Sequence, residues 1–529
     1  MTRTFVLVLA VLVAAQTAPS MQAPAAQAAL DYPPSTFADP DRRAKLASAF
    51  EAIDRRIDAF MKERHVPGAA WGIVIDGELA HAGTAGFRNL EAKAPVTPDS
   101  VFRIASMTKS FTAMAVMKLR DEGRISLDEP AERYVPELKG LRYPTSDSRR
   151  ITVRDLLSQQ TGFPEDNPWG DQQLAATEEE FTRMLEGGIP FSNTSGIAYE
   201  YSNYGFAILG RLITNVSGVP YRDYIASAIL QPLGMTSTML EPSAAGDNLV
   251  LGYRWEDEQW KLEPALPDGA FGSMGGMLTS MADLAKYVGA FLDAFPARDG
   301  AETSPVRRAT LREMQQVWRA RPAVVTAADG KIDLNAGGYA YGLRVGQSCA
   351  FDHIVAHTGG LPGYGSIMQW LPEHGVGFIA FGNVTYTGWT PIAGEVFDML
   401  AATGALEPRT HQPSPWLTEA RESVSRLILN WDDAEADRMA AMNLYLDRAK
   451  ERRRDEIQAL RADVGACTAP DSFDYVENWL RGQWTMACER GNLRVAITLA
   501  PTMPPRVQHL DVRKVSAGAA APLPACRVQ

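Results

Sequence analysis

The sequence predicts an α/β protein with an antiparallel sheet flanked by helices, a helical domain beside it, and a small α+β domain at the C-terminal end. Three observations indicate this fold class. A helical pattern is followed directly by a hairpin, a long middle region has helical periodicity, and three closely spaced strands follow residue 353. At roughly 150 residues per domain, the 529 residues allow two to four domains.

The first expected elements are a helix and a hairpin. Residues 43–64 place apolar side chains at steps of three and four with charged residues between them, which is typical of an amphipathic helix. Residues 70–75 and 78–81 are separated by Asp76-Gly77, a pair that suits the positive φ angles of a tight turn. We therefore expect a helix that leads straight into a two-stranded hairpin.

The middle of the chain is expected to be helical before strands return. Residues 107–122 form a strongly apolar stretch that stops at Gly123, and helical signals dominate from there to about residue 240. Strands are expected at residues 353–356, 366–370 and 376–381, followed by a helix near 391–402. Their close spacing indicates an antiparallel meander, to which the opening hairpin can add two more strands.

A proline-rich segment separates the last part of the chain from the rest. Pro408, Pro413 and Pro415 occur in a stretch without an apolar period, so we place a linker there. The predicted organisation is a signal peptide over residues 1–28, a main domain over 29–405, a linker over 406–416 and an α+β accessory domain over 417–529.

The N-terminal residues are typical of a secretory signal peptide. Arg3 precedes an apolar run from Phe5 to Ala15, and Ala26-Gln27-Ala28 has the form of a cleavage site. The alternative is an uncleaved anchor, which needs about 20 apolar residues, more than this run supplies. We expect an exported protein, periplasmic or secreted, without stable membrane insertion.

Composition argues against several kinds of partner and cofactor. The formal net charge of -11 repels phosphate backbones, so we expect no nucleic-acid partner. The seven His and four Cys contain neither a C-x-x-C nor an H-E-x-x-H pattern, and the close pair His353 and His357 lacks a nearby third ligand. We therefore expect no metal and no cofactor, while the oligomeric state stays open.

The four cysteines suggest one structural disulfide. We predict that Cys467 pairs with Cys488, because both lie in the same small domain and close a loop of about 20 residues. The alternative is that Cys526 takes one of these partners.

The sharpest chemical feature is Ser106-Met107-Thr108-Lys109, at the start of the apolar helix. Side chains three positions apart share one face of a helix, so the Lys109 amine can reach the Ser106 hydroxyl. Burial would lower the pKa of Lys109, and a helix N-terminus favours negative charge at Ser106. The alternative is a helix-capping Ser with a surface Lys, because such a pair occurs about once by chance in a chain of this length.

Two further motifs follow in order: Tyr201-Ser202-Asn203 before an apolar helix, and His357-Thr358-Gly359-Gly360 at the end of a strand. With the Ser-Lys pair, they resemble the serine β-lactamase and penicillin-binding-protein superfamily, specifically the class C branch with its D-aminopeptidase, DD-carboxypeptidase and esterase relatives. The resemblance covers roughly residues 43–405. It implies the β-lactamase/DD-peptidase-like fold for the main domain.

The resemblance implies catalytic roles for three residues. Ser106 would be the acylated nucleophile, Lys109 would help to remove its proton, and Tyr201 would act as general base and acid. Asn203 would orient Lys109 and bind a substrate amide. Tyr199 is a rival for the tyrosine role, but it lacks an Asn two residues further on.

The strand motif is expected to bind substrate. The resemblance places His357, Thr358 and Gly359 along the substrate site, and it assigns the oxyanion hole to the backbone N–H groups of Ser106 and Gly360. β-Lactamases of this family carry Lys where this chain has His357. A neutral imidazole holds a carboxylate less well than an ammonium does, so we expect poor β-lactamase activity.

We therefore expect a secreted serine hydrolase that forms an acyl-enzyme at Ser106. Its substrate would be a small ester, an amide or a D-amino-acid peptide. The alternatives are a catalytically silent sensor that binds peptidoglycan fragments or β-lactams, and a class C-type β-lactamase.

Overall fold

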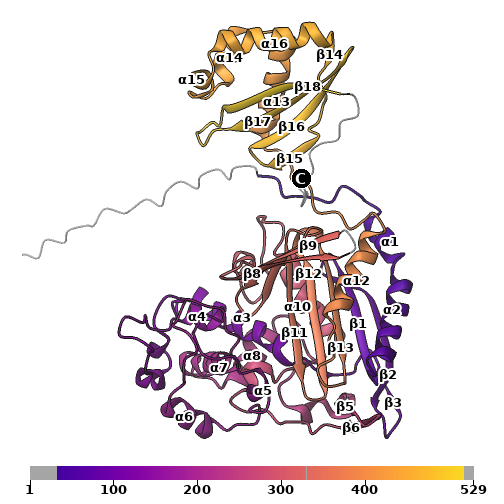
Figure 1. Cartoon of the computed structure of the whole chain (residues 1–529), viewed down its shortest axis with the longest axis vertical. Helices are drawn as coiled ribbons and strands as arrows, with labels where there is room; N and C mark the ends of the chain where they lie inside the picture. Colours follow the sequence, from indigo (N-terminus) through magenta and orange to yellow (C-terminus); the bar gives the residue numbers. More distant parts are fainter. Residues whose placement is uncertain (1–31, 329–330, 517–529) are drawn as a thin grey trace, which may run out of the picture.

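The computed structural model describes residues 32–328 and 331–516. The expected signal peptide and Cys526 lie outside these residues. Two sheets organise the described chain, one of nine strands in the main part and one of five strands near the C-terminal end (Figure 1).

The nine-stranded sheet has the order β3-β2-β1-β13-β12-β11-β10-β9-β8. Its strands are β1 (Gly68–Ile75), β2 (Glu78–Asn89), β3 (Ala94–Pro95), β8 (Arg319–Ala328), β9 (Lys331–Tyr339), β10 (Arg344–Gln347), β11 (Ile354–Leu361), β12 (Tyr364–Leu371) and β13 (Val376–Gly382). The expected meander is confirmed, since β11, β12 and β13 pair antiparallel. The opening hairpin is also confirmed and adds β1 and β2 beside β13.

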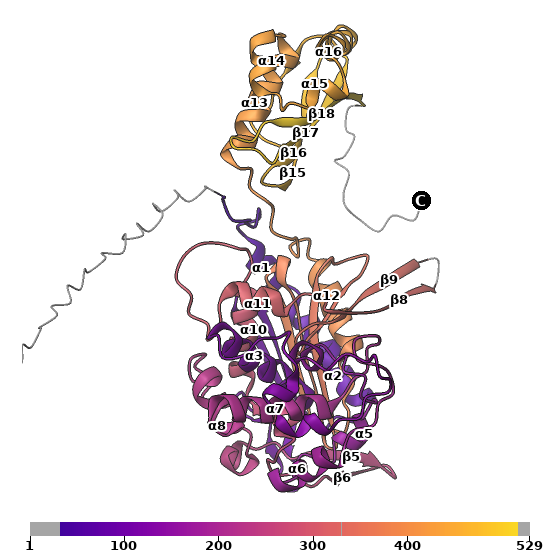
Figure 2. The ribbon, with the colours of Figure 1, turned by 90° about the vertical axis from the view of Figure 1, so that its left-hand side faces the viewer.

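Strands β8 to β10 were not expected from the sequence. Pro322 argues against a strand because it cannot donate a ladder hydrogen bond. The structure accommodates it in β8, the edge strand, where the register with β9 shifts between Arg321 and Val324. Figure 2 shows the β8–β9 hairpin projecting from the rest of the sheet.

Helices cover both faces of this sheet. One face packs against α1 (Arg42–Ala47), α2 (Phe50–Glu63) and α12 (Thr390–Ala401). The other packs against α3 (Thr108–Asp121) and α10 (Met281–Asp293). The sequence predicts one helix over residues 43–64, but the structure has two helices, because the helix breaks at Ser48. The Ser48 hydroxyl donates to the carbonyl of Lys45 (2.6 Å), and this bond competes with the helical hydrogen-bond pattern.

The helical region expected in the middle of the chain is confirmed. Its helices are α4 (Val153–Leu157), α5 (Asn167–Gly170), α6 (Glu178–Gly187), α7 (Asn203–Ser217) and α8 (Tyr221–Ile225). Other short elements are β4 (Phe102–Arg103), β5 (Tyr253–Glu256), β6 (Gln259–Leu262), α9 (Gly272–Gly275), β7 (Leu278–Thr279) and α11 (Arg308–Met314). Helix α3 is almost wholly buried and shares one hydrophobic core with α7 and one face of the sheet.

The last part of the chain has a hydrophobic core of its own, formed by residues between 417 and 512. Its elements are α13 (Pro415–Leu429), α14 (Asp433–Met439), α15 (Leu444–Asp447), α16 (Lys450–Val464), β14 (Cys467–Thr468), β15 (Tyr475–Asn478), β16 (Arg481–Cys488), β17 (Gly491–Leu499) and β18 (Val507–Val515). The predicted Cys467–Cys488 disulfide is confirmed and joins β14 to β16. We call residues 415–515 the tail.

The N-terminal lead-in touches both the linker and the tail (Figure 1). Thr36 forms a β-bridge with Thr410 in the linker. The ring of Tyr32 lies 4.6 Å from that of Trp479, whose indole N–H donates to the carbonyl of Pro33 (2.9 Å). Within the described ranges, no helix combines the length and the apolar character needed to cross a membrane.

Candidate active site

Ser106 lies where the nine-stranded sheet meets the helical region. It is the middle residue of a short 3-10 helix, η1 (Ala105–Met107), directly before α3. Ala105 has a φ of 50°, in the left-handed region that residues with a side chain seldom adopt. The hydroxyl of Ser366 on β12 donates to the carbonyl of Ile104 (2.8 Å), and a Cβ on Gly359 would lie only 2.0 Å from the same oxygen. Helix η1 therefore packs directly against β11 and β12.

Lys109 connects the nucleophile to the rest of the site. Its Nζ donates to Ser106 Oγ (2.9 Å), to Asn203 Oδ1 (2.6 Å) and to the carbonyl of Met274 (2.8 Å). The side chain is completely buried, and burial lowers its pKa to about 7. A neutral amine is thus accessible near pH 7, as a base for Ser106 requires.

Tyr201 is the tyrosine that the structure brings to Ser106. It lies just before α7 and is buried. Burial raises its pKa far above the usual value, and a hydrogen bond with the Ser106 side chain opposes this shift. Lys109 Nζ lies 4.8 Å from the centre of its ring. Tyr199 instead lies under the guanidinium of Arg321, which is 5.0 Å from its ring.

Asn203 is fixed by the loop before α5. The carboxylate of Asp166 accepts hydrogen bonds from the backbone N–H groups of Asn203 (2.7 Å) and Tyr204 (2.8 Å), at the start of α7. The Asn203 amide donates to Asn167 Oδ1 (3.3 Å). Gly170 packs so closely that a Cβ there would lie 2.8 Å from the amide nitrogen of Asn203. This loop thereby holds the residue that orients the Lys109 amine.

His357 is buried beside the site and already has partners. Its Nδ1 lies 2.7 Å from the carbonyl of Thr358, and its Nε2 lies 3.0 Å from the hydroxyl of Tyr339. Burial, together with the charge of Arg344, lowers the pKa of His357 well below its usual value. The imidazole is therefore neutral near pH 7, and both of its nitrogens are engaged within the protein.

The end of β11 presents a backbone edge to η1. Pairing with β10 ends at Ala356, whereas residues 357–361 continue to pair with β12 on the other side. Thr358 and Gly360 are partly exposed on this segment, and Gly359 is buried. A Cβ on Gly360 would lie 2.7 Å from the ring of Tyr386. A free strand edge facing the start of a helix is the arrangement that an oxyanion hole from Ser106 and Gly360 needs.

Arg344 on β10 was not identified from the sequence. Its guanidinium carbon lies 5.8 Å from the centre of the Tyr201 ring, and its Nε is buried without a hydrogen-bond partner. No hydrogen bond or ion pair joins its side chain to another residue of the described chain. No local motif marks it, because it reaches the site only through the pairing of β10 with β11. The structure thus places a permanent cation beside Tyr201.

Asp171 and Tyr386 also meet beside this site, and no sequence signal marks them. The hydroxyl of Tyr386, in the loop after β13, donates to Asp171 Oδ2 (2.8 Å). Asp171 follows α5, is 1% exposed, and has a buried Oδ1 without a hydrogen-bond partner. Burial raises the pKa of Asp171 to about 6. The pair joins the helical region to the sheet region next to Gly360.

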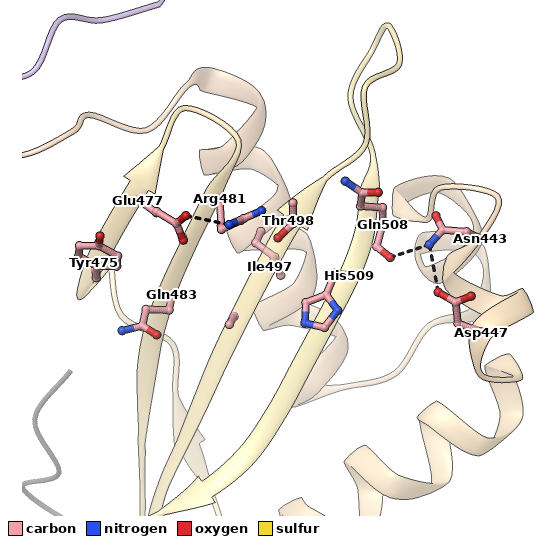
Figure 3. A pocket seen from close by; sticks show the side chains of 12 residues that line it. Asn443, Asp447, Tyr475, Glu477, Arg481, Gln483, Ile497, Thr498, Gln508 and His509 are labelled. Atoms are coloured by element: carbon pink, nitrogen blue, oxygen red, sulfur yellow. Dashed lines mark hydrogen bonds and ion pairs between the residues drawn. The ribbon is translucent and has the colours of Figure 1, made fainter. Parts of the chain in front are cut away.

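A hollow lies in the tail (Figure 3). It has a volume of about 920 Å³ and is lined largely by polar residues of β15 to β18, with Arg481 paired to Glu477 (2.7 Å). Its lining contains no Ser-Lys pair of the kind found at Ser106 and Lys109. In the described chain, no cluster of three or more His, Cys, Asp or Glu side chains is arranged to hold a metal ion. None of the residues grouped around Ser106 lines this hollow.

Known proteins resemble this chain in sequence and fold. The profile of the Beta-lactamase family matches residues 53–403. Protein flp of Staphylococcus aureus (strain COL) is 26% identical over 341 residues, and the match spans 63% of each chain. Beta-lactamase-like protein 2 of Dictyostelium discoideum is 30% identical over 264 residues, 47% of each chain. The chain thus spans only 63% of the length of the staphylococcal relative.

One solved structure has the same fold. It is the octameric penicillin-binding protein homologue from Pyrococcus abyssi, which superposes with a TM-score of 0.58 at 23% sequence identity. The superposition covers 89% of this chain and 94% of that chain.

Proposed function

Because the chain belongs to the beta-lactamase family, whose members are generally serine hydrolases, we propose that it hydrolyses its substrate through an acyl-enzyme at Ser106. The observation that carries the proposal is the buried amine of Lys109, which is hydrogen-bonded to Ser106 Oγ and has a pKa of about 7. A capping Ser with a surface Lys would show neither feature.

Acylation begins at Ser106. Its Oγ forms a bond to the substrate carbonyl carbon while the neutral Lys109 amine takes the hydroxyl proton. The carbonyl electron pair moves onto the oxygen, and the backbone N–H groups of Ser106 and Gly360 stabilise the resulting charge. Loss of one such donor typically costs about 3–4 kcal/mol.

Tyr201 completes the proton path. Its raised pKa keeps the phenol protonated, so it can donate to the leaving group as the bond to that group breaks, and it is reprotonated from Lys109. In deacylation, the same groups take a proton from the attacking water and return one to Ser106. In this scheme Lys109 holds the proton between the two steps, and Tyr201 transfers it to and from the reacting groups.

Arg344 favours a substrate whose leaving group carries a carboxylate. We expected weak carboxylate binding because His357 is neutral, but the neighbouring strand carries Arg344 beside Tyr201, and its guanidinium has no ion pair among the described residues. A guanidinium can bind a carboxylate with two parallel hydrogen bonds. Among esters, amides and D-amino-acid peptides, the position of Arg344 supports a D-amino-acid peptide with a free C-terminus, the substrate of a DD-carboxypeptidase.

The test combines covalent labelling with a comparison of substrates. Mass spectrometry after treatment with a fluorophosphonate should show one adduct, on the peptide that contains Ser106, and none in Ser106→Ala. The value of kcat/KM should be higher for a D-alanyl-D-alanine peptide than for nitrocefin. Absence of both adduct and turnover would favour the silent sensor, and a tenfold advantage for nitrocefin would favour the β-lactamase.

We also propose that the protein is exported. The support is the sequence before residue 29, which has a basic start, an apolar run and small residues at the cleavage site. N-terminal sequencing of the protein from the producing cells should find a chain that starts near Ala29. An intact Met1 on the mature protein would contradict this.

A further inference from the structure

We propose that Asp171 binds a positively charged amine on the acyl part of the substrate, at the position that the Tyr386 hydroxyl occupies in this structure. The inference rests on the proposed function, because it names a chemical feature of the group that Ser106 would carry. It concerns a subsite that the catalytic motifs do not include.

The position of Asp171 ties it to the acyl side of the cleft. It follows Gly170, which packs against the side chain of Asn203, and Asn203 accepts a hydrogen bond from Lys109. Its other neighbour is Tyr386, whose ring lies against Gly360. Asp171 thus lies between the residue expected to bind a substrate amide and the strand expected to bind the substrate carbonyl.

The bonding of Asp171 is incomplete for a buried carboxylate. One oxygen, Oδ1, is buried without a hydrogen-bond partner, and the other, Oδ2, accepts the hydroxyl of Tyr386 (2.8 Å). No ion pair links Asp171 to a Lys, Arg or His side chain within the described ranges. A buried carboxylate that lacks a cation is costly, and an ammonium group that donates to it would remove much of that cost.

Burial raises the pKa of Asp171 and the charge of Lys109 opposes this shift, but no ion pair or hydrogen bond joins the two side chains in the described part of the chain. Lys109 directs its donors to Ser106, Asn203 and Met274, and burial lowers its pKa to about 7. The carboxylate of Asp166 on the same loop is occupied by backbone N–H groups. Glu165 adds further negative charge that acts on Asp171. The acyl side of the cleft is therefore negative.

The leaving-group side has the opposite charge. Arg344 lies beside Tyr201, the residue proposed to protonate the leaving group. The cleft therefore places a cation near the departing group and a carboxylate near the retained group. A substrate with an amine on its acyl part and a carboxylate on its leaving group matches both charges.

Tyr386 occupies the subsite in the absence of substrate. Its side chain is 48% exposed, although its hydroxyl is bonded to a residue that is 1% exposed. A neutral phenol makes a weaker hydrogen bond to a carboxylate than an ammonium does. An amine on the substrate would therefore displace the hydroxyl of Tyr386 from Asp171.

The test compares two esters of nearly the same shape. The phenyl ester of D-alanine carries an ammonium where the phenyl ester of isobutyric acid carries a methyl group. Each kcat/KM is divided by the hydroxide rate constant of the same ester, which removes intrinsic reactivity. Wild type should favour the D-alanyl ester by about tenfold or more in this corrected ratio, and Asp171→Asn should reduce the preference to about twofold or less.

Two further variants separate binding from a structural role. Tyr386→Phe removes the competing hydroxyl and should raise the corrected ratio by about threefold, since it breaks one hydrogen bond to Asp171. Asp299→Asn is a matched change at an exposed carboxylate outside the site and should leave the ratio unchanged.

Three results would overturn the inference. The first is a wild-type ratio near one, and the second is an equal loss for both esters in Asp171→Asn. The third, which does not depend on that variant, is a ratio in Tyr386→Phe that is unchanged or lower. If neither ester is hydrolysed and no adduct forms at Ser106, it is the proposed function that fails.

Discussion

The nine-stranded sheet and the five-stranded sheet differ in how they are covered. Every residue of β1 and β13 in the nine-stranded sheet is buried, because helices pack on both faces. In β16 of the tail, Gly482, Trp484 and Met486 are buried, whereas Arg481 and Gln483 alternate with them on the open face. One sheet is an interior layer, and the other has one face in water.

This difference also gives two lysines opposite environments. Lys109 lies where the covered sheet meets the helical region, and complete burial lowers its pKa to about 7. Lys450 in the tail is paired with Asp437 (2.9 Å) near the surface, and the hydrogen bond with Asp437 raises its pKa. The two lysines show that burial, and not the residue type, lowers the pKa of Lys109.

The largest expected effect comes from removing one lysine from each region. Lys109→Ala should lower kcat by about 100-fold or more, because general-base catalysis is lost, and Tyr201→Phe should do the same. Lys450→Ala in the tail should change kcat by less than about twofold. Steady-state kinetics on a nitrophenyl ester measures kcat for all three variants. Comparable losses of kcat from Lys109→Ala and Lys450→Ala would contradict the expected difference between the two regions.

The second comparison uses one arginine from each region. Arg344→Gln should lower kcat/KM for a D-alanyl-D-alanine peptide by about tenfold or more, because the leaving-group carboxylate loses a charged partner. A neutral ester should be much less affected. Arg481→Gln in the tail hollow should alter neither substrate, and a drop with Arg481→Gln equal to that with Arg344→Gln would show that the open sheet also takes part.

The third prediction concerns pH. Below a pKa of about 7 the Lys109 amine is protonated and cannot accept the proton of Ser106. The value of kcat/KM for an uncharged ester should therefore rise with pH up to about 7 and fall by about tenfold per unit below it. A profile that stays flat down to pH 5.5 would contradict the assignment of Lys109 as the base.

The smallest expected effect on activity comes from the tail disulfide. Replacing Cys467 and Cys488 with Ser should lower the free energy of unfolding of the tail by about 3 kcal/mol, because a loop of 21 residues is no longer closed. Calorimetry should show the tail transition at a lower temperature, while the kcat/KM of the ester stays within twofold. A matching loss of activity would mean that the tail supports the catalytic cleft.

The sequence was sufficient to select the candidate residues that lie in short motifs and that the structure brings close together. Ser106 and Lys109 share one helix face, and the Tyr201 and His357 motifs each stand at the end of a regular element. Arg344 was not predicted because β10 has only four residues, which are too few to show a pattern. The residue reaches the site only through the pairing of β10 with β11.

Asp171 and Tyr386 could not be predicted for a related reason. They are 215 positions apart, and each lies in a loop whose conformation depends on the elements at its ends. The tail strand β16 was not predicted either. Alternating burial is a weak signal when the outward positions include Arg, Gln and Thr.

The contacts of the N-terminal lead-in change how the tail can move. A body joined through a single linker can swivel about three axes, but a body held at two points can turn only about the line between them. The tail is held by the linker and again by Tyr32 and Pro33 at Trp479. The chain before α1 is therefore a second attachment point of the tail. Its removal would leave only the linker and would allow the tail to rotate about two further axes.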